Sequence, residues 1–256
     1  VNRGVIQAFL EARDGFSVDR VIADRDLNAA FAAACARLGL PGKPADWNRR
    51  LMSLRKGRHF RGLPRSKVTA FPLEEAEFEK YKFACEIAMQ RFDVEGHSLD
   101  NVLCDPELAR RFDKLALSMI PEPLSSLKIR CFALRLRKRA RDYRTNARAL
   151  LKVVPLPRKF SCPFDLLLLR VPASPGLYWL RRGDRRLYVG ETRNLRERLQ
   201  VQFSSNTFDF WGEDRRALQL GYQAVDSAEL VAPNQSVWIG RWNPEGNWAS
   251  LGVPPT

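Results

Sequence analysis

An internal repeat in the first half of this 256-residue chain is the feature that most constrains its fold. The segment 17–31 (SVDRVIADRDLNAAF) aligns without gaps to the segment 98–112 (SLDNVLCDPELARRF), 81 residues further on. The LRK tripeptides at 54–56 and 136–138 extend the match to the end of each copy. One structural unit is therefore expected twice in succession.

The two copies, residues 1–72 and 78–150, are predicted to be helical. Each has the pattern of a helix, a short helix, a helix, a loop and a final helix. Asp24 and Asp105 stand where an N-cap residue belongs, and apolar residues follow at four-residue spacing, as on the buried face of an amphipathic helix. The segment 63–75, which contains two prolines, is predicted to link the copies.

The last helix of each copy is strongly basic. The whole chain has 43 Lys and Arg against 29 Asp and Glu, a net charge of +14, so a polyanion such as nucleic acid is the expected partner. A basic terminal helix in a compact helical unit is typical of helix-turn-helix modules that bind DNA, and a solvated charged face is the alternative. The residues predicted to contact DNA are Arg49, Arg50, Arg55, Lys56, Arg135, Arg137, Lys138, Arg139 and Arg141.

A different pattern of strands, turns and aromatic residues marks the last third of the chain. The stretch 176–198 (GLYWLRRGDRRLYVGETRNLRER) predicts two apolar strands joined by a turn at Gly183, and then a helix capped by Thr192 or Asn194. Two tyrosines and an arginine beside a glycine indicate a phosphate site rather than a core. Farther on, the segments predicted as a third strand and a following helix are 217–225 and 233–242.

This stretch resembles the signature of the GIY-YIG nuclease superfamily. The matching residues are G-L-Y at 176–178, Y-V-G at 188–190 and T-R-N-L-R-E-R at 192–198, and the resemblance covers roughly residues 163–256. It implies a small three-stranded antiparallel sheet flanked by helices, with one active site. The expected fold is therefore α+β, with two helical DNA-binding repeats followed by a nuclease domain at 160–256.

The resemblance also implies roles for individual side chains. Tyr178 and Tyr188 would lie near the attacking water and the scissile phosphate, and Tyr178 is the better candidate for the general base. A tyrosine serves as a base only where a cation lowers its pKa. Arg198 would contact the phosphate and stabilise its developing charge. Asn247 matches the asparagine that ends the family pattern, and Gln202 replaces a histidine found in many relatives.

The family's metal-binding residue is a glutamate on the last helix, about three helical turns before that asparagine. In this chain the spacing leads to Gln235. Mg²⁺ or Mn²⁺ is the implied cofactor, and an amide at Gln235 is expected to bind it poorly. An inactivated nuclease is one explanation, and a naturally inactive DNA-binding descendant is another. Glu229 and Glu245 are alternative metal ligands.

The hypothesis from sequence is a magnesium-dependent DNA endonuclease, a site-specific hydrolase of the restriction or mobile-element type. The alternative is a catalytically silent DNA-binding protein or regulator that uses the nuclease fold as a phosphate clamp, and RNA is a further possible substrate. Because one active site cuts one strand, cleavage of both strands of double-stranded DNA requires a homodimer or two successive nicks. Five scattered cysteines indicate reduced thiols and a cytoplasmic protein, and no apolar run has membrane-spanning length.

Overall fold

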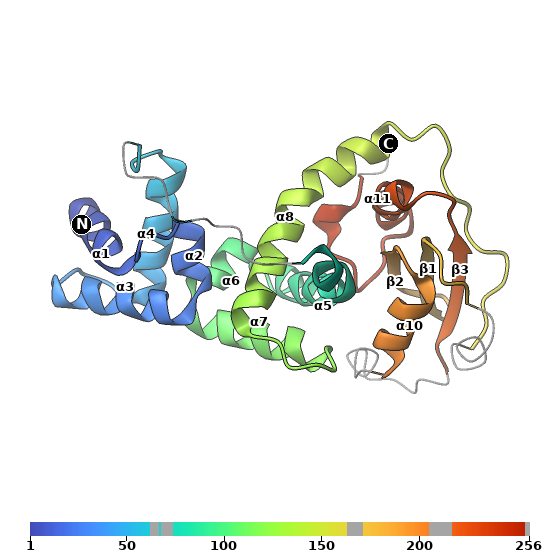
Figure 1. Ribbon diagram of the computed structural model, residues 1–256, viewed down its shortest axis with the longest axis horizontal. Helices are drawn as coiled ribbons and strands as arrows, with labels where there is room; N and C mark the ends of the chain where they lie inside the picture. Colours follow the sequence, from blue (N-terminus) through green and yellow to red (C-terminus); the bar gives the residue numbers. More distant parts are fainter. Residues whose placement is uncertain (62–66, 68–73, 163–170, 205–216, 254–256) are drawn as a thin grey trace. The chain divides into compact units, whose positions relative to one another are not determined.

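The computed structural model describes residues 1–61, 67, 74–162, 171–204 and 217–253, and these contain ten α-helices and three β-strands (Figure 1). Helices followed by a small C-terminal sheet confirm the predicted mixture of helix and sheet. The predicted linker 63–75 lies mostly outside the described residues, as do parts of the predicted domain 160–256. Within the described residues, no helix is both long enough and apolar enough to cross a membrane.

Two compact units divide the chain. The first unit consists of Val1–Leu73, Phe92–Lys114 and Ser125–Cys131. The second unit consists of Glu74–Arg91, Leu115–Leu124 and Phe132–Thr256. These units do not follow the copies of the sequence repeat, because parts of the second copy belong to each of them. The predicted domains, which follow the repeat in sequence, stay a prediction.

The repeat in sequence is also a repeat of helices. The first copy forms α1 (Asn2–Ala12), α2 (Val18–Ala23), α3 (Arg25–Arg37) and α4 (Pro44–Lys56). The second copy forms α5 (Glu75–Val94), α6 (Leu99–Cys104), α7 (Pro106–Ser118) and α8 (Ser126–Arg148). Both bounds of α6 and of α7 lie 81 residues after those of α2 and α3.

Equivalent side chains cap the equivalent helices. The Asp24 carboxylate accepts hydrogen bonds from the backbone N–H groups of Asp26 and Leu27, at 3.1 and 3.3 Å. The Asp105 carboxylate does the same one repeat later, at 3.0 and 3.4 Å. A carboxylate in this position satisfies N–H groups that have no acceptor inside the helix. The predicted N-caps are therefore confirmed.

Within the first unit, the two copies contact each other through equivalent groups. The Asn48 side chain donates to the carbonyl oxygen of Cys104 at 2.8 Å. Arg130, which stands 82 residues after Asn48, donates to the carbonyl oxygen of Ala23 at 3.2 Å, and Ala23 is the counterpart of Cys104. Such reciprocity is the mark of an interface with local two-fold symmetry.

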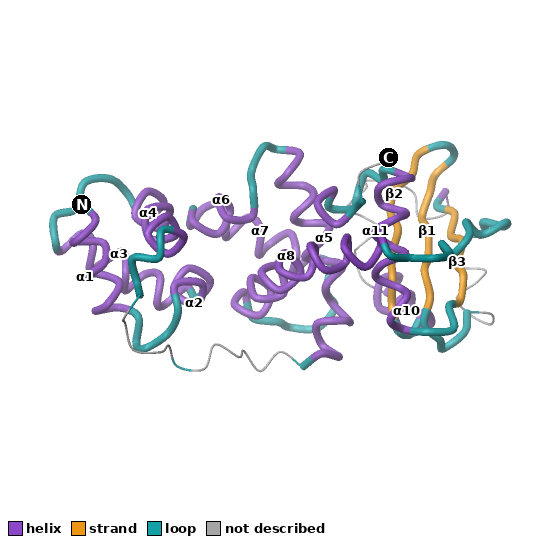
Figure 2. Tube along the Cα trace, turned by 90° about the horizontal axis from the view of Figure 1, so that it is seen from above, coloured by secondary structure: helices purple, strands orange, loops and turns teal. Residues whose placement is uncertain are grey.

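The second unit contains the sheet. The strands β1 (Gly176–Arg182), β2 (Arg185–Thr192) and β3 (Gln219–Ala224) are antiparallel in the order β2-β1-β3 (Figure 2). Gly183 lies in the turn between β1 and β2 with φ +53°, a left-handed conformation that glycine adopts without cost. The predicted hairpin and third strand are confirmed.

Two helices of the second unit follow strands of the sheet. They are α10 (Leu195–Ser204) and α11 (Val231–Trp242). The predicted helix 233–242 begins two residues earlier, because the 3₁₀ turn η3 (Ala228–Leu230) leads directly into it. Pro233 is tolerated in the first turn, where a backbone N–H has no intrahelical acceptor.

Alternation along the strands separates the apolar core from the predicted site. Leu177, Trp179 and Val189 pack with Val231 and Trp242 in a buried cluster. Side chains of adjacent strand residues point to opposite faces of a sheet. Tyr178, which pairs with Gly190, and Tyr188, which pairs with Leu180, therefore lie on the face opposite to this cluster.

Candidate functional site

Tyr178 and Tyr188 are neighbours on one face of the hairpin, with ring centroids 6.0 Å apart. Both side chains are buried. The ring of Tyr178 lies directly against Gly190, where an added Cβ atom would stand 1.8 Å from a ring carbon. Only glycine at position 190 leaves room for this ring. The structure thus gives a steric reason for the glycine of the Y-V-G motif.

Glu86 of α5 is the acidic group at the centre of the cluster. The Tyr188 hydroxyl donates a hydrogen bond to its carboxylate at 2.7 Å, and the Asn247 amide also donates to it. The amide nitrogen of Gln235 lies 3.5 Å from a Glu86 oxygen. These four residues come from α5, β2, α11 and the segment after α11. The structure therefore brings three of the predicted site residues together around a glutamate that the sequence analysis missed.

Gln235 and Asn247 also bind the outer edge of β2. Both amide nitrogens donate to the carbonyl oxygen of Val189, at 2.9 Å from Gln235 and 2.8 Å from Asn247. The Asn247 side-chain oxygen accepts from the backbone N–H of Val189 at 2.7 Å. The two amides therefore satisfy polar groups of an edge strand that would otherwise lack partners.

Arg198 lies on the first turns of α10. The Asn194 side chain caps this helix by accepting from the backbone N–H of Glu197 at 3.2 Å, which identifies Asn194 as the cap between the two candidates. Thr192 supports the cap, because its hydroxyl accepts from the N–H of Asn194 at 3.1 Å. The Arg198 guanidinium is buried and donates to the carbonyl oxygen of Glu79 on α5.

Burial dominates the electrostatics of the cluster. It raises the pKa of Tyr178 to about 12, although the nearby Arg198 guanidinium opposes this shift. Burial and the Glu86 carboxylate raise the pKa of Tyr188 well above its ordinary value. Burial also raises the pKa of Glu86 to about 7, against the effect of the hydrogen bonds from Asn247 and Tyr188. In this closed arrangement both tyrosines stay protonated at neutral pH, so neither has the lowered pKa that a general base requires.

A second buried charge cluster lies one turn along α5. The Lys82 ammonium forms ion pairs with Glu79, at 2.6 Å, and with Glu191 of β2. Burial alone would lower the pKa of Lys82, but Glu191 and Glu79 raise it. A buried ammonium between two carboxylates is a stable arrangement only while all three charges remain in place.

The donor set around Gln235 does not suit Mg²⁺. Mg²⁺ binds anionic oxygens, but Gln235 is neutral and Glu86 already accepts hydrogen bonds from its neighbours. In the part of the chain that the structure describes, no three His, Cys, Asp or Glu side chains gather as a metal-binding group. The alternative ligands lie elsewhere, because Glu245 pairs with Arg185 at 2.7 Å and Glu229 is exposed on η3.

No family model, curated protein or solved structure matches this chain.

The signal that points to Glu86 in the sequence is weak but present. Residues 81–89 (YKFACEIAM) are apolar except for Lys82 and Glu86, and every residue of this segment is buried. Charged side chains in such a segment need partners, because burying an unpaired charge is costly. Glu79 lies one turn before Lys82, but the sequence does not identify Glu191 and Tyr188, the partners of Lys82 and Glu86 that lie more than 100 residues away.

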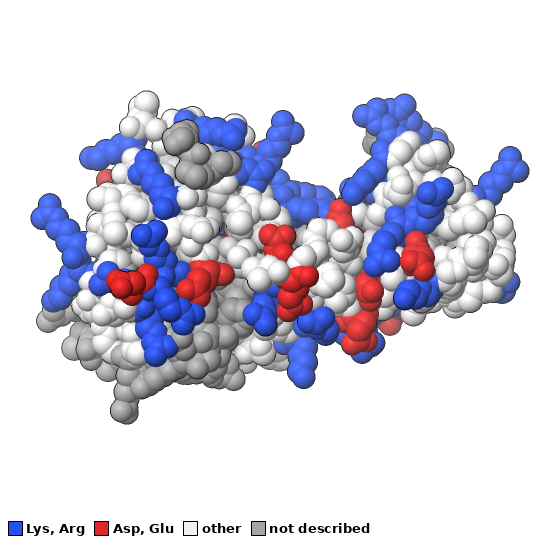
Figure 3. Space-filling view, turned by 180° about the vertical axis from the view of Figure 1, so that it is seen from behind, with Lys and Arg blue, Asp and Glu red and all other residues white. Residues whose placement is uncertain are grey.

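The predicted DNA-binding residues differ in their surroundings. Those exposed to solvent are Arg49, Arg50, Lys56, Lys138 and Arg141. Arg55 pairs with Asp19 at 2.7 Å, and Arg137 is half-buried. Arg135 and Arg139 were expected to face solvent or phosphate, but both are half-buried and pair with Glu75 on the first turn of α5. Figure 3 shows Lys and Arg spread over one face of the molecule, with Asp and Glu among them.

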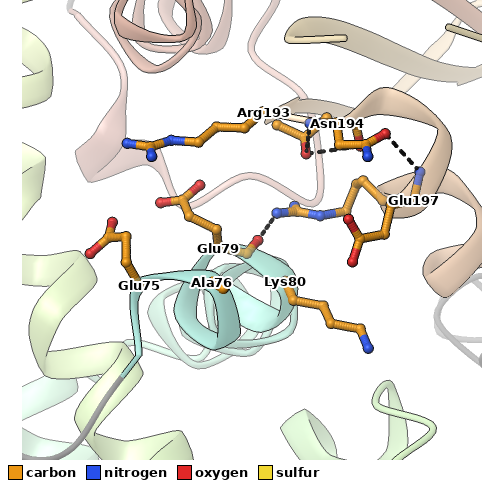
Figure 4. Close-up of a pocket in the computed structure, with 9 residues that line it drawn as sticks. Glu75, Ala76, Glu79, Lys80, Arg193, Asn194 and Glu197 are labelled. Atoms are coloured by element: carbon orange, nitrogen blue, oxygen red, sulfur yellow. Dashed lines mark hydrogen bonds between the residues drawn. The ribbon is translucent and has the colours of Figure 1, made fainter. Parts of the chain in front are cut away.

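A cavity of about 410 Å³ lies beside Arg198, between the first turns of α5 and α10. Figure 4 shows Arg193 and Asn194 on one side of it and Glu75 and Glu79 on the other. Its lining carries both signs of charge, so it does not present the uniformly positive surface that a phosphate backbone prefers. Arg198 lines this cavity while its guanidinium stays bound to α5.

Proposed function

We propose that this chain is a DNA-binding protein with a C-terminal endonuclease domain of the GIY-YIG type, present here in a form that lacks the metal-binding carboxylate. The proposal rests on one observation: the residues that the motif selects lie together in a single cluster. They come from separate segments of the chain, and the cluster they form is buried. Its members are Tyr178, Tyr188, Arg198, Gln235 and Asn247.

The roles follow from the chemistry of these side chains. Arg198 keeps its charge at any physiological pH and suits the charge that develops on a phosphate during attack by water. The two tyrosine hydroxyls would orient the attacking water. Asn247 holds the β2 edge and so acts as a positioning residue. The basic residues of α4 and α8 would bind the duplex backbone, which gives affinity without sequence preference.

The test is to restore the carboxylate with Gln235→Glu and to measure nicking of supercoiled plasmid. The substitution supplies at position 235 the anionic oxygen ligand that Mg²⁺ prefers. We expect nicking with Mg²⁺ and none with a chelator. Arg198→Ala in this background should lower the rate by about 10² or more, because it removes stabilisation of the transition state.

Gln223→Glu is the matched control, because Gln223 lies outside the cluster and its side chain bonds only the nearby Ala224 carbonyl among the bonds described. This variant adds the same charge and should remain inactive. If Gln235→Glu cuts neither double-stranded DNA nor RNA of varied sequence, the nuclease proposal is wrong. A binding competition between the two nucleic acids then decides which one the protein binds.

One observation favours the second candidate, a catalytically silent DNA-binding protein. The Gln235 amide nitrogen donates to the Val189 carbonyl and faces the Glu86 carboxylate. A carboxylate at this position would instead meet two acceptors, so the surrounding groups suit an amide. A silent protein would bind duplex DNA with the same salt dependence, and Gln235→Glu would not make it cleave.

A further inference from the structure

One face of α5 is directed at the candidate site along most of its length. Residues 79, 82, 83, 86 and 90 follow helical spacing and share one side of the helix. The Glu79 carbonyl binds Arg198, and the Phe83 ring lies 5.5 Å from the Arg198 guanidinium carbon. Glu86 accepts from Tyr188 and Asn247. Gln90 accepts from the backbone N–H of Ala249 at 3.2 Å.

The groups that α5 binds are the hydrogen-bond donors of the site. Arg198, Tyr188 and Asn247 all donate to oxygen atoms of α5. A phosphodiester presents oxygen acceptors of the same kind, and an ionised carboxylate resembles it in charge. We propose that α5 is a built-in inhibitor of the site, in which Glu86 and the Glu79 carbonyl take the hydrogen bonds that a DNA phosphate would take. This inference rests on the proposed function, because it assigns those donors to a phosphate.

Burial of the site supports the same conclusion. The exposed fractions are 0 % for Tyr178, 1 % for Tyr188 and 3 % for Arg198. A phosphate on a duplex cannot reach these side chains while α5 covers them. Within the described residues, no hydrogen bond of normal geometry reaches the Tyr178 hydroxyl, which is a cost that a bound phosphate or water would remove.

The two sides of α5 differ in how easily they separate from their neighbours. The side toward the site carries Phe83 but is held mainly by hydrogen bonds and ion pairs of Glu79, Lys82, Glu86 and Gln90, and water can take the place of these polar contacts. Another side carries Phe78, whose ring packs against Phe132 of α8 with centroids 5.8 Å apart. Arg135 and Arg139 of α8 also bind Glu75 of α5. We therefore expect α5 to remain with α8 and to part from the site along its polar side.

Hydrogen–deuterium exchange with and without a duplex of about 30 base pairs tests the opening directly. A duplex of this length covers about three helical turns. DNA binding should increase exchange in peptides that cover residues 79–90 and 185–192, because α5 no longer packs against β2 when the site opens. Protection in these peptides that is unchanged when DNA is bound overturns the inference.

Glu86→Ala tests the role of the carboxylate, with Asp93→Ala as the matched control, since Asp93 is an exposed acid on the same helix. Both variants remove one carboxyl group from α5, so the comparison separates the position of Glu86 from the general loss of an acidic side chain on this helix. Glu86→Ala should bind duplex DNA about tenfold more tightly than the control, which corresponds to about 1.4 kcal/mol. Gln90→Ala should also increase the affinity for DNA, but by a smaller factor. It provides the test if Glu86→Ala does not fold.

Cleavage by the same variants in the Gln235→Glu background separates the two possible roles of Glu86. Faster nicking by Glu86→Ala supports inhibition by α5, whereas slower nicking with unchanged exchange overturns it and makes Glu86 a group that the reaction needs. If no variant binds or cuts nucleic acid, the proposed function fails. In that case, hydrogen–deuterium exchange of residues 185–192 without DNA still tests whether α5 covers the site. Faster exchange in Glu86→Ala than in Asp93→Ala supports this role of α5, and equal exchange in the two variants contradicts it.

Discussion

Gly190 is the residue on which the position of the Tyr178 ring depends. It pairs with Tyr178 across the hairpin, and any side chain at position 190 would overlap the ring. Gly190→Ala is expected to lower the free energy of unfolding by about 3 kcal/mol or more, because a buried aromatic ring on a central strand cannot move aside. Urea unfolding followed by tryptophan fluorescence measures this loss.

Gly96→Ala provides the comparison. Gly96 has φ +82°, but an added Cβ atom there meets no heavy atom within 4 Å. Its substitution should cost only the backbone strain of a left-handed residue, about 1–2 kcal/mol. Equal losses for the two variants would contradict the steric requirement that the Tyr178 ring sets at position 190.

The motif located the tyrosines, the arginine and the glycine, because their roles depend on a local hairpin and the helix that follows it. Gln235 and Asn247 were found by spacing from a short pattern near the end of the chain. Glu86 was not found, because its partner Tyr188 lies 102 residues away and no local pattern connects them. Side chains that meet only through tertiary packing leave little trace in a single sequence.

The helix α5 carries two buried charged side chains, Lys82 and Glu86. Lys82 is buried between Glu79 and Glu191, whereas Lys80, two residues earlier, forms a more exposed ion pair with Glu122. Lys82→Ala removes the ammonium that pairs with the buried Glu191 carboxylate and should lower the free energy of unfolding by about 3–5 kcal/mol. Lys80→Ala should cost about 1 kcal/mol or less. Thermal and urea unfolding of both variants measure the difference, and equal losses would contradict the importance of the buried cluster.

The protonation of Glu86 makes the α5 contact dependent on pH. Its pKa is about 7 in the folded protein, against 4.5 for the ordinary carboxyl. A raised pKa means that folding favours the protonated form of Glu86. The stability that this group contributes is therefore fully present below about pH 4.5 and is lost as pH rises through about 7. The groups around the carboxyl include Tyr188, Asn247 and Gln235, with Lys82 and Glu191 acting at longer range.

Glu86→Gln removes this titration and tests the sign of the effect. The wild-type protein should lose more free energy of unfolding than Glu86→Gln between about pH 5 and about pH 8, because only the wild type must bury an ionised carboxylate at the higher pH. Urea titrations at both pH values give the comparison, and Asp93→Asn is the control for loss of a charge on α5. A wild-type protein that becomes more stable than Glu86→Gln over this range would show that Glu86 is stabilised as an anion.

Individual helices and strands were predicted more reliably than the way in which they pack together. The caps, the hairpin turn and the alternation of the strands are local properties, and the observed helices and strands follow them. The sequence repeat, however, assigns α5 to the second helical copy, whereas the N-terminal part of α5 belongs to the compact unit that contains the sheet. The repeat therefore predicts which helices form, but it does not predict that α5 packs against the sheet through Glu86 and Lys82.

For the whole molecule, the excess of positive charge determines how it should bind DNA. Lys138 and Arg141 are exposed on α8, whereas Arg135 and Arg139 are half-buried. Each phosphate contact releases condensed counterions, so the logarithm of the binding constant falls with the logarithm of salt concentration by about 0.9 per contact. Replacing Lys138 and Arg141 together by glutamine should weaken binding to all duplex sequences alike and flatten this slope by about 1.8.

Titrations of a fluorescent duplex at several salt concentrations measure the slope. Arg110 and Lys114 on α7 are the matched control, since both are exposed and lie outside the predicted DNA-binding helices. Replacing these two by glutamine removes the same net charge, but it should leave the slope close to that of the wild type, because long-range attraction is screened within about 10 Å at ordinary salt. Equal changes for the two pairs would mean that the protein attracts DNA only through its net charge and that α8 makes no phosphate contacts of its own.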